Sequence, residues 1–481
     1  MLTSTANEDI RTSFWPRVRE FAVPASMIET ATARRLAGDW AGACAAAGFD
    51  VDLHLRAVAR DHGRELASRV RSDLRALAPD LLRWHMPRIA PDGLLRPGVT
   101  LTLAQHGTPE GPVHLVARTA PAWADAGQRI SLALWSRSTA NAVGHPHPRP
   151  NRRFRLDLHR HLWDAGRAGE LWGRSGAGEV RERDWGDVVR DRAGKAGQGP
   201  EAGEPSIRSR PRQLAGHEPE LMVPPDCAVD RWAAEARILL AAEGRTGGVV
   251  LVRLGGRQRL VLELGADDDV IRPVPTPAAG TLSALPVLPD AATWVLPDVQ
   301  LLRAGAIEAE RLHPLVAAAL APDRPATGPP RTPDRPGRPR LVECRGARHR
   351  IGLVDGVLAP LDHDPDEIRR EELLVALTGT PLPCLQAIDE AHRRPHCLAG
   401  VRERLVHGDT AGALAVVEGL LGPEALLRTG PLRDELEAAA LRRITYGLFR
   451  AGLTGPGPAW FRPRPSGRDP RNRRTHPRHA T

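Results

Sequence analysis

The spacing of apolar residues first predicts a long helix near the N-terminus. From Val51 to Leu81 the apolar residues recur every three or four positions, which places them on one side of a helix. We therefore expect a single amphipathic helix over this segment, with one buried stripe. His62 lies on the same stripe, and we expect it to be a core histidine.

Strict alternation replaces this spacing after residue 98 and predicts strands. Apolar and polar residues alternate in segments that are bounded by glycine and proline, and such alternation is typical of strands with one buried face. We expect these strands to form an antiparallel sheet covered by the helical layer. The segments are Val99–Gln105, Pro112–Thr119, Arg129–Trp135 and Arg152–His159.

The middle of the chain predicts a helix over Asp230–Gly244 and then a β-hairpin. Gly255 and Gly256 separate two β-branched segments, and paired glycines supply the positive φ that a two-residue turn requires. Leu341–Gly356 repeats the hairpin pattern, with arginine alternating with aliphatic residues in both copies. Either an old duplication or the convergence of amphipathic strands explains this similarity.

The C-terminal region predicts helices throughout, and it completes the fold class. These helices span Asp364–Gly379, Leu382–Arg393, His396–His407, Asp409–Leu421 and Pro431–Gly452. The predicted class is α+β multidomain, with N-terminal helices and a small antiparallel sheet, a middle helix plus β-hairpin module, and a C-terminal β-hairpin followed by an all-helical bundle.

Segments rich in proline and glycine indicate the domain boundaries. Residues 194–225 mix glycine, proline and charge without periodicity, and Ala321–Arg340 holds seven prolines in twenty residues, too many for a helix or a central strand. The predicted organisation is a helical hairpin, long helix and strands over 1–193, a linker over 194–225, a small α+β module over 226–320, a Pro-rich linker over 321–340, a β-hairpin plus helical domain over 341–452, and an Arg-rich disordered tail over 453–481.

Two similar turns occur near opposite ends of the chain. Gly38–Ala43 reads GDWAGA and Gly408–Ala413 reads GDTAGA. Glycine suits the left-handed position that ends a helix, and Asp39 or Asp409 can accept backbone N–H bonds as the N-cap of the next helix. Each copy therefore predicts a tight antiparallel helical hairpin.

The first of these turns resembles the inter-helix turn of tetratricopeptide-type repeats, in which Gly-Asp-aromatic-x-x-Ala occurs at the same place. Gly38, Asp39, Trp40 and Ala43 fit that pattern. The resemblance covers one turn and parts of its flanking helices, twice, and it implies helical hairpins. The family's period of about 34 residues is missing between the copies, so we favour isolated hairpins over a repeat array. A helix-turn-helix DNA reader over Ile28–Phe49 is the third interpretation.

The charge of the chain leaves two interpretations open. The net charge is +9 and the sequence pI is about 10.4, but Lys195 is the only lysine among 67 basic residues. This arginine excess is typical of a GC-rich coding bias and serves general solvation of the surface. Alternatively it indicates a polyanion site, with the Arg-rich tail as the contact.

Cysteine usage and hydropathy predict a cytoplasmic protein without a membrane span. The five cysteines are an odd number and form no CxxC, which argues against a disulfide framework and a ribbon-type zinc site. No run of eighteen apolar residues occurs, and the first thirty residues lack the apolar core of a secretory signal.

Two groups of histidine and cysteine are candidates for metal binding. The first is the cluster His145, His147, His159 and His161, in which His-x-His pairs on a strand would share one face; interleaved arginines would repel a cation. The second group spans Cys384–Cys397 and contains Cys384, His392, His396 and Cys397. Its His-x3-His spacing resembles half a zinc finger, without the paired-cysteine half.

No motif specifies a reaction, so we assign no catalytic, cofactor-binding or metal-binding residue. Three hypotheses remain. The first is a non-catalytic interaction or accessory protein with protein partners. The second is a nucleic-acid- or polyanion-associated regulator that uses its arginine-rich surfaces and tail. The third is an unrecognised metal-dependent enzyme at the four-histidine cluster.

Overall fold

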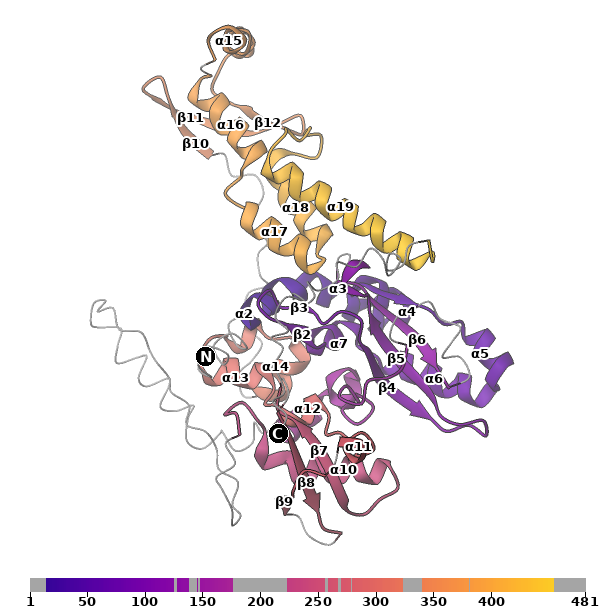
Figure 1. Ribbon diagram of the computed structural model, residues 1–481. Helices are drawn as coiled ribbons and strands as arrows, with labels where there is room; N and C mark the ends of the chain where they lie inside the picture. The colour runs from indigo at the N-terminus through magenta and orange to yellow at the C-terminus, as the bar shows by residue number, and fades with distance from the viewer. Residues whose placement is uncertain are drawn as a thin grey trace, which may run out of the picture.

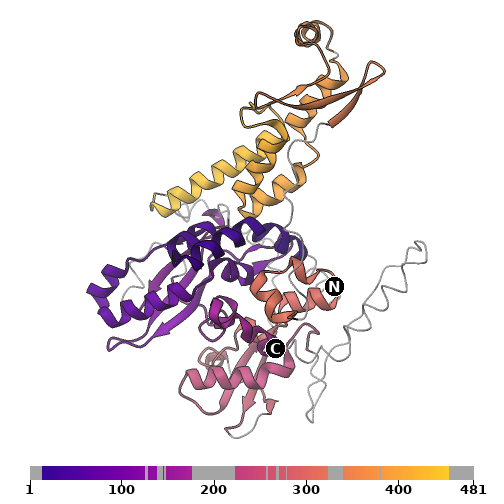
Figure 2. The same cartoon turned by 180° about the vertical axis from the view of Figure 1, so that it is seen from behind.

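The structure is a computed structural model that describes residues 14–124, 128–137, 145, 148–175, 223–255, 258–266, 270–277, 279–322, 340–379 and 381–453. Its helices and several small sheets form the predicted α+β multidomain arrangement. Residues 14–322, called the body here, carry residues 340–453, called the arm, which projects from the body (Figure 1). Figure 2 shows the same projection from behind. The tail from residue 454, and the predicted linkers apart from 223–225, 321–322 and 340, lie outside the described residues.

A four-stranded sheet forms the centre of the first part of the body, a name used for its described residues up to 175. Its strand order is β1-β6-β5-β4, and β1 runs parallel to β6 while the other neighbours are antiparallel. Three of the four predicted strands are present, and the short parallel strand β1 was not predicted. The strands are β1 (Phe49–Val51), β4 (Thr100–His106), β5 (Val113–Thr119) and β6 (Ile130–Trp135).

The prediction of a strand over Arg152–His159 is wrong. Phe154 and Leu156 are buried, as the alternation indicated, and the segment touches β4 through the amide of Thr102, which donates to the carbonyl of Phe154 at 3.1 Å. The chain then turns, because the amides of Leu158 and His159 each donate to a carbonyl three residues earlier. These local bonds replace a strand ladder.

The prediction of one long helix over Val51–Leu81 is also wrong. Gly63 has a φ of +90° and interrupts the helix, and Pro79 has no amide proton to continue it. The buried stripe itself is correct and includes Leu66, Val70 and Leu74. His62 ends α5 and is half-buried, so the expectation of a core histidine is wrong. The helices are α5 (Leu55–His62), α6 (Arg64–Ala76) and α7 (Pro79–His85).

Both GD-x-AGA turns have the predicted local geometry. Gly38 and Gly408 have φ values of +78° and +89°. Asp39 accepts a hydrogen bond from the amide of Gly42 at 2.8 Å, and Asp409 accepts one from the amide of Gly412 at 2.9 Å. Each turn therefore joins two helices, α3 (Ala25–Leu36) to α4 (Trp40–Ala46) and α17 (Leu398–His407) to α18 (Thr410–Leu421).

The middle of the chain contains the predicted helix and hairpin, with a third strand. The helix is α10 (Trp232–Ala242), and the sheet contains β7 (Gly248–Arg253), β8 (Arg259–Leu264) and β9 (Ile271–Pro273) in that order. Two later helices, α13 (Pro297–Arg303) and α14 (Pro314–Leu320), pack into the core of the first part of the body. The shorter helix α12 (Asp290–Thr293) packs with α10.

The arm begins with a three-stranded antiparallel sheet and continues with helices. The hairpin of β10 (Arg340–Cys344) and β11 (Ala347–Val354) was predicted, and β12 (Val357–Pro360) extends it. All five predicted helices are present, with ends that differ by at most two residues. Besides α17 and α18 they are α15 (Pro365–Thr378), α16 (Pro383–Arg393) and α19 (Pro431–Arg450). Within the described part of the chain, no helix combines the length and the apolar character that a membrane span requires.

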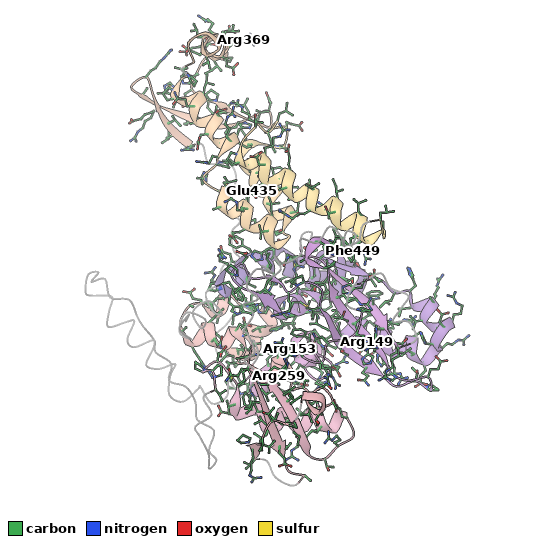
Figure 3. All side chains as sticks on the ribbon, in the orientation of Figure 1. Arg149, Arg153, Arg259, Arg369, Glu435 and Phe449 are labelled. Atoms are coloured by element: carbon green, nitrogen blue, oxygen red, sulfur yellow. The ribbon has the colours of Figure 1, made fainter. Side chains whose placement is uncertain are left out.

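Polar contacts join the arm to the body. The guanidinium of Arg83 is buried and donates to the carbonyl of His407 in α17 at 2.9 Å. At the end of α19, the hydroxyl of Tyr446 donates to Asp50 of β1 at 2.5 Å, and Arg450 binds Asp52. Phe449 marks this junction in Figure 3, whereas Arg369 on α15 marks the far end of the arm.

Candidate functional site

The four-histidine cluster of the sequence is only partly brought together. His159 and His161 are neighbours in the core, with ring centroids 5.7 Å apart and exposed fractions of 1% and 3%. The Nε2 of His145 lies 3.0 Å from the carbonyl oxygen of Thr119. His147 lies outside the described residues. The described members do not form a group of three or more metal-ligating side chains.

The carboxylate beside these histidines is that of Glu235, and it already forms an ion pair within the core. Glu235 lies 3.1 Å from the Nε2 of His159 and also binds Arg174. Burial alone would raise the pKa of Glu235, but hydrogen bonds from His159 and Arg174 lower it to about 2. The pKa of His161 falls to about 2, first because of burial and then because of the neighbouring His159 and Arg174. This arrangement is a buried ionic network of the core.

Helix α16 keeps the members of the second predicted group apart from one another. That group is Cys384, His392, His396 and Cys397. α16 places Cys384 in its first turn and His392 in its last, and eight residues of helix extend about 12 Å. Pro395 follows, so that Cys397 is the N-cap of the next helix, α17. Cys384 therefore has different neighbours from those that its position in the sequence indicated.

The neighbours of Cys384 form a candidate metal centre in the arm. Cys344, His349, His363 and Cys384 each offer one ligand atom, and these atoms all lie within 4.8 Å of one another. The two thiols are buried, and the side chain of His363 is 2% exposed. Among the described residues this is the only group of three or more side chains with such geometry.

Four separate segments supply these side chains. Cys344 ends β10, His349 lies on β11, His363 lies between β12 and α15, and Cys384 lies in the first turn of α16. Burial, together with the neighbouring Cys344, raises the pKa of the Cys384 thiol to about 11. Cys344, Ile351, Leu382, Cys384 and Ile388 are also the buried members of the small core of this part of the arm.

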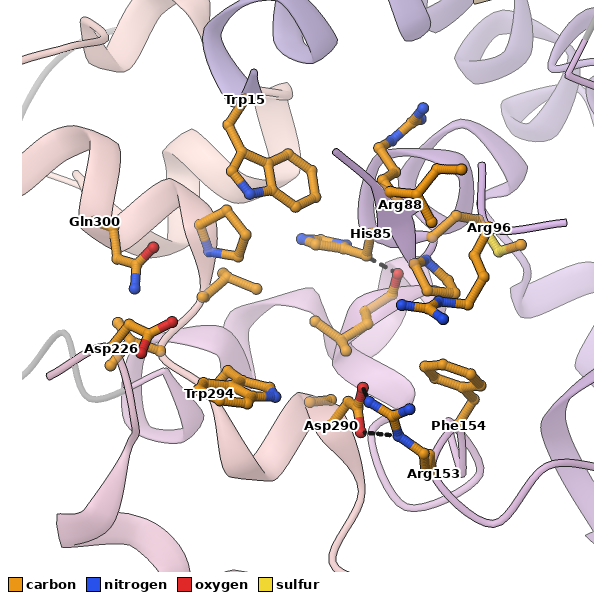
Figure 4. Close-up of a pocket in the computed structure, with 18 of the residues that line it drawn as sticks. Trp15, His85, Arg88, Arg96, Arg153, Phe154, Asp226, Asp290, Trp294 and Gln300 are labelled. Carbon is orange, nitrogen blue, oxygen red and sulfur yellow. Dashed lines mark hydrogen bonds and ion pairs between the residues drawn. The ribbon is translucent and has the colours of Figure 1, made fainter. Parts of the chain in front are cut away.

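A pocket in the body is the second candidate site. It has a volume of about 360 Å³, within the size range of small-molecule sites. Trp15, Phe154 and Trp294 supply aromatic walls, and Arg153 forms a bidentate ion pair with Asp290 at one side (Figure 4). The pocket lies between the first part of the body and the segment that links α12 to α13.

His85 is a neutral histidine in the wall of the pocket. The Nδ1 of His85 lies 3.0 Å from the carbonyl oxygen of Leu162, and because a carbonyl can only accept, Nδ1 carries the proton. Burial lowers the pKa of His85 to about 4, so the ring is neutral near pH 7 and Nε2 keeps its lone pair. This Nε2 is itself buried and has no hydrogen-bond partner among the described residues; a carboxylate oxygen of Asp298 lies 3.9 Å from it.

A buried ion pair fixes the same wall. Arg19 donates to Asp298 at 2.8 Å and to the carbonyl of Trp84 at 2.6 Å, and its guanidinium stacks over the rings of Trp15 and Trp84. Trp84 also donates to Asp298 through its indole nitrogen. Aromatic walls held in this way suit a planar ligand.

The chain matches no family model, no curated protein and no solved structure.

Sequence analysis missed three of the four residues of the candidate metal centre. The sequence did contain a pattern that indicates two of these ligands. Cys344 and His349 are separated by four residues across the glycine of a hairpin turn, and such a turn places two ligands on one side. No such pattern in the sequence places His363 and Cys384, because the packing of α16 on the sheet and the path of the segment between β12 and α15 decide their positions.

Proposed function

We propose that this protein is a non-catalytic interaction or accessory protein that binds a partner protein through its arm. One observation carries the proposal. Twelve of the sixteen large apolar side chains that are exposed on the described residues lie in the arm, which is the smaller part of the described chain. Concentrations of exposed apolar side chains mark interaction surfaces, whereas isolated ones are normal.

The clearest of these surfaces lies on α19. This helix buries Leu432, Ala439 and Tyr446 on the side that faces the arm and the body. Its other side exposes an apolar stripe of Leu441, Ile444 and Leu448, with exposed fractions of 64%, 59% and 37%. Spacings of three and four residues place the stripe on one face, as in helices that bind a partner helix or groove.

The far end of the arm presents a second apolar surface. Leu373 and Leu374 are exposed on α15, the helix on which Arg369 is labelled in Figure 3. Four aliphatic side chains of the adjoining sheet are exposed as well, namely Leu341, Leu353, Val354 and Val357. An arm that projects from the body and carries such side chains is suited to insertion into, or capture by, another protein.

The test compares two triple variants in affinity purification with crosslinking and quantitative mass spectrometry. Leu441→Ser, Ile444→Ser and Leu448→Ser are combined in one. The matched control combines Leu36→Ser, Ile238→Ser and Val270→Ser, three exposed apolar positions of the body. Burial of each such side chain contributes about 1.5–3 kcal/mol, so the arm variant loses affinity for its partner by at least about 100-fold. Equal recovery of partners with both variants would contradict the proposal.

A cytoplasmic location is part of this proposal. None of the five cysteines forms a disulfide, which agrees with a reducing compartment.

The polyanion hypothesis has less support from the described arginines. In the arm hairpin, Arg345 binds Glu367 and Glu371, and Arg350 forms an ion pair with Asp362. These cations are therefore neutralised by carboxylates of the same arm. The Arg-rich tail, the other basis of that hypothesis, lies outside the described residues.

A further inference from the structure

We propose that Cys344, His349, His363 and Cys384 bind one structural Zn²⁺ ion. The proposal is independent of the partner of the arm, because it rests on the geometry of these four side chains alone.

The distances fit a single ion. On a tetrahedral ion, zinc–sulfur and zinc–nitrogen bonds of about 2.3 and 2.0 Å place two ligand atoms about 3.3–3.8 Å apart. All four ligand atoms lie within 4.8 Å of one another, so small side-chain movements bring them onto one ion. The Nδ1 of His349 and the Nε2 of His363 are 2.5 Å apart, closer than an ordinary N–H hydrogen bond of about 2.7 Å or more. On a tetrahedral zinc ion the two nitrogens separate to about 3.3 Å.

The donor set selects the metal and its role. Two thiolates and two imidazoles are soft and borderline ligands that suit zinc and disfavour calcium and magnesium. All four positions of a tetrahedron are filled by protein side chains, which leaves no position for water or substrate. Closed sites of this kind are structural, whereas catalytic zinc keeps an open position.

A set of outer contacts orients His363 for this role. The Nδ1 of His363 lies 3.4 Å from a carboxylate oxygen of Glu367, so that Nδ1 holds the proton and Nε2 presents its lone pair to the ion. Arg345 binds the other oxygen of Glu367 at 2.6 Å and also binds Glu371. Metal-ligating histidines are characteristically held by a carboxylate in this way.

A second ion pair fixes the backbone next to His363. Asp362 accepts from the amide and the guanidinium of Arg350 on β11. The segment between β12 and α15 is thereby tied to the strand that carries His349.

The surrounding core is too small to hold these segments by itself. It contains five buried residues, of which two are the proposed ligands Cys344 and Cys384. α15 has no buried residue among its described side chains; its partly buried Ile368 packs against this core, and Arg345 binds its Glu367 and Glu371. Domains with little apolar core commonly depend on a structural metal, whose binding free energy contributes directly to folding.

Metal analysis of the full-length protein, purified without metal-chelating steps, tests the proposal. We expect one zinc per chain by mass spectrometry of the digested protein. Cys384→Ser and His349→Ala should each lower the zinc content per chain at least about tenfold, because each removes a zinc ligand. Cys397→Ser changes a cysteine outside the group and should leave the zinc content unchanged. Wild-type protein with substoichiometric zinc, or a Cys344–Cys384 disulfide detected in the native intact mass, would overturn the proposal.

X-ray absorption at the zinc edge provides a measurement that does not depend on variants that fold. The expected first coordination shell of the wild-type protein contains two sulfur and two nitrogen ligands at about 2.3 and 2.0 Å. A shell of oxygen and nitrogen only would show that the zinc lies elsewhere and would refute the assignment. Removal of the ion from the wild-type protein by a chelator should also accelerate proteolysis between Arg345 and Gly379. The rate of proteolysis would not change with the chelator if the four side chains held no metal.

Discussion

Three buried histidines, two in the body and one in the arm, make the stability of the protein sensitive to mild acid. His85, His161 and His407 are almost inaccessible to solvent, and burial lowers their pKa values to about 4, about 2 and about 3. Neighbouring cations add to the effect, as Arg88 and Arg83 do for His407. All three rings are therefore neutral in the folded protein near pH 7.

These pKa shifts predict a loss of stability below about pH 6.5. The unfolded chain protonates each histidine near its ordinary pKa and the folded chain does not, so the free energy of unfolding falls as the pH drops, until the folded-state pKa is reached. Each histidine contributes a loss of about 1.3 kcal/mol between about pH 7.5 and about pH 5.5. Urea unfolding at these two pH values measures the loss in the free energy of unfolding.

The variant His407→Leu should show a smaller pH dependence, by about that amount. His54→Gln, at an exposed position, should retain the full pH dependence. An unchanged pH dependence in His407→Leu would mean that His407 has the same pKa in the folded and unfolded protein, contrary to the lowered pKa expected from its burial.

At the scale of elements, local chemistry fixed most helices of the arm. Pro365, Pro383 and Pro431 each begin a helix, and Gly379 and Gly408 end one with positive φ. Such signals act within a few residues, so the sequence places these ends accurately. The segment Arg152–His159 shows the opposite case, because its alternation is real but its hydrogen bonds close local turns.

Gly422 shows how an element boundary depends on a distant contact. It follows α18 with a φ of +95°, and a Cβ atom there would overlap the carbonyl oxygen of Gly356 in the β11–β12 turn. Gly422→Ala should therefore lower the free energy of unfolding by about 2–4 kcal/mol. Thermal and urea unfolding, followed by circular dichroism, measure this change.

Gly400 provides the matched control for this substitution. It lies inside α17, where an added Cβ meets no atom within 4 Å, so Gly400→Ala should stabilise the protein by up to about 1 kcal/mol. Equal effects of the two substitutions would show that the close approach to Gly356 is not maintained in solution.

At the scale of the whole molecule, the orientation of the arm depends on a small charged junction. Asp50 accepts hydrogen bonds from Tyr446 of the arm and Arg129 of the body. Burial alone would raise the pKa of Asp50, but these two hydrogen bonds lower it below its ordinary value. The carboxylate therefore stays ionised at neutral pH and keeps α19 against β1.

Asp50→Ala should loosen the arm from the body without unfolding either. It removes charge-assisted hydrogen bonds of about 2 kcal/mol, so small-angle X-ray scattering should show a larger radius of gyration with an unchanged circular dichroism spectrum. Asp61→Ala removes an exposed ion pair with Arg60 instead and should leave the scattering unchanged. Superimposable scattering of Asp50→Ala and wild type would show that other contacts, such as that of Arg83 with His407, hold the arm.

The sequence by itself determined what depends on neighbours along the chain. The helices of the arm, the hairpins and the aspartate caps of both GD-x-AGA turns follow from hydrogen bonds and spacing within a few residues. Only the tertiary structure decided which distant side chains converge. Cys384 meets Cys344, His349 and His363 because α16 packs on the arm sheet, whereas the neighbours of Cys384 in sequence are carried away along the helix axis.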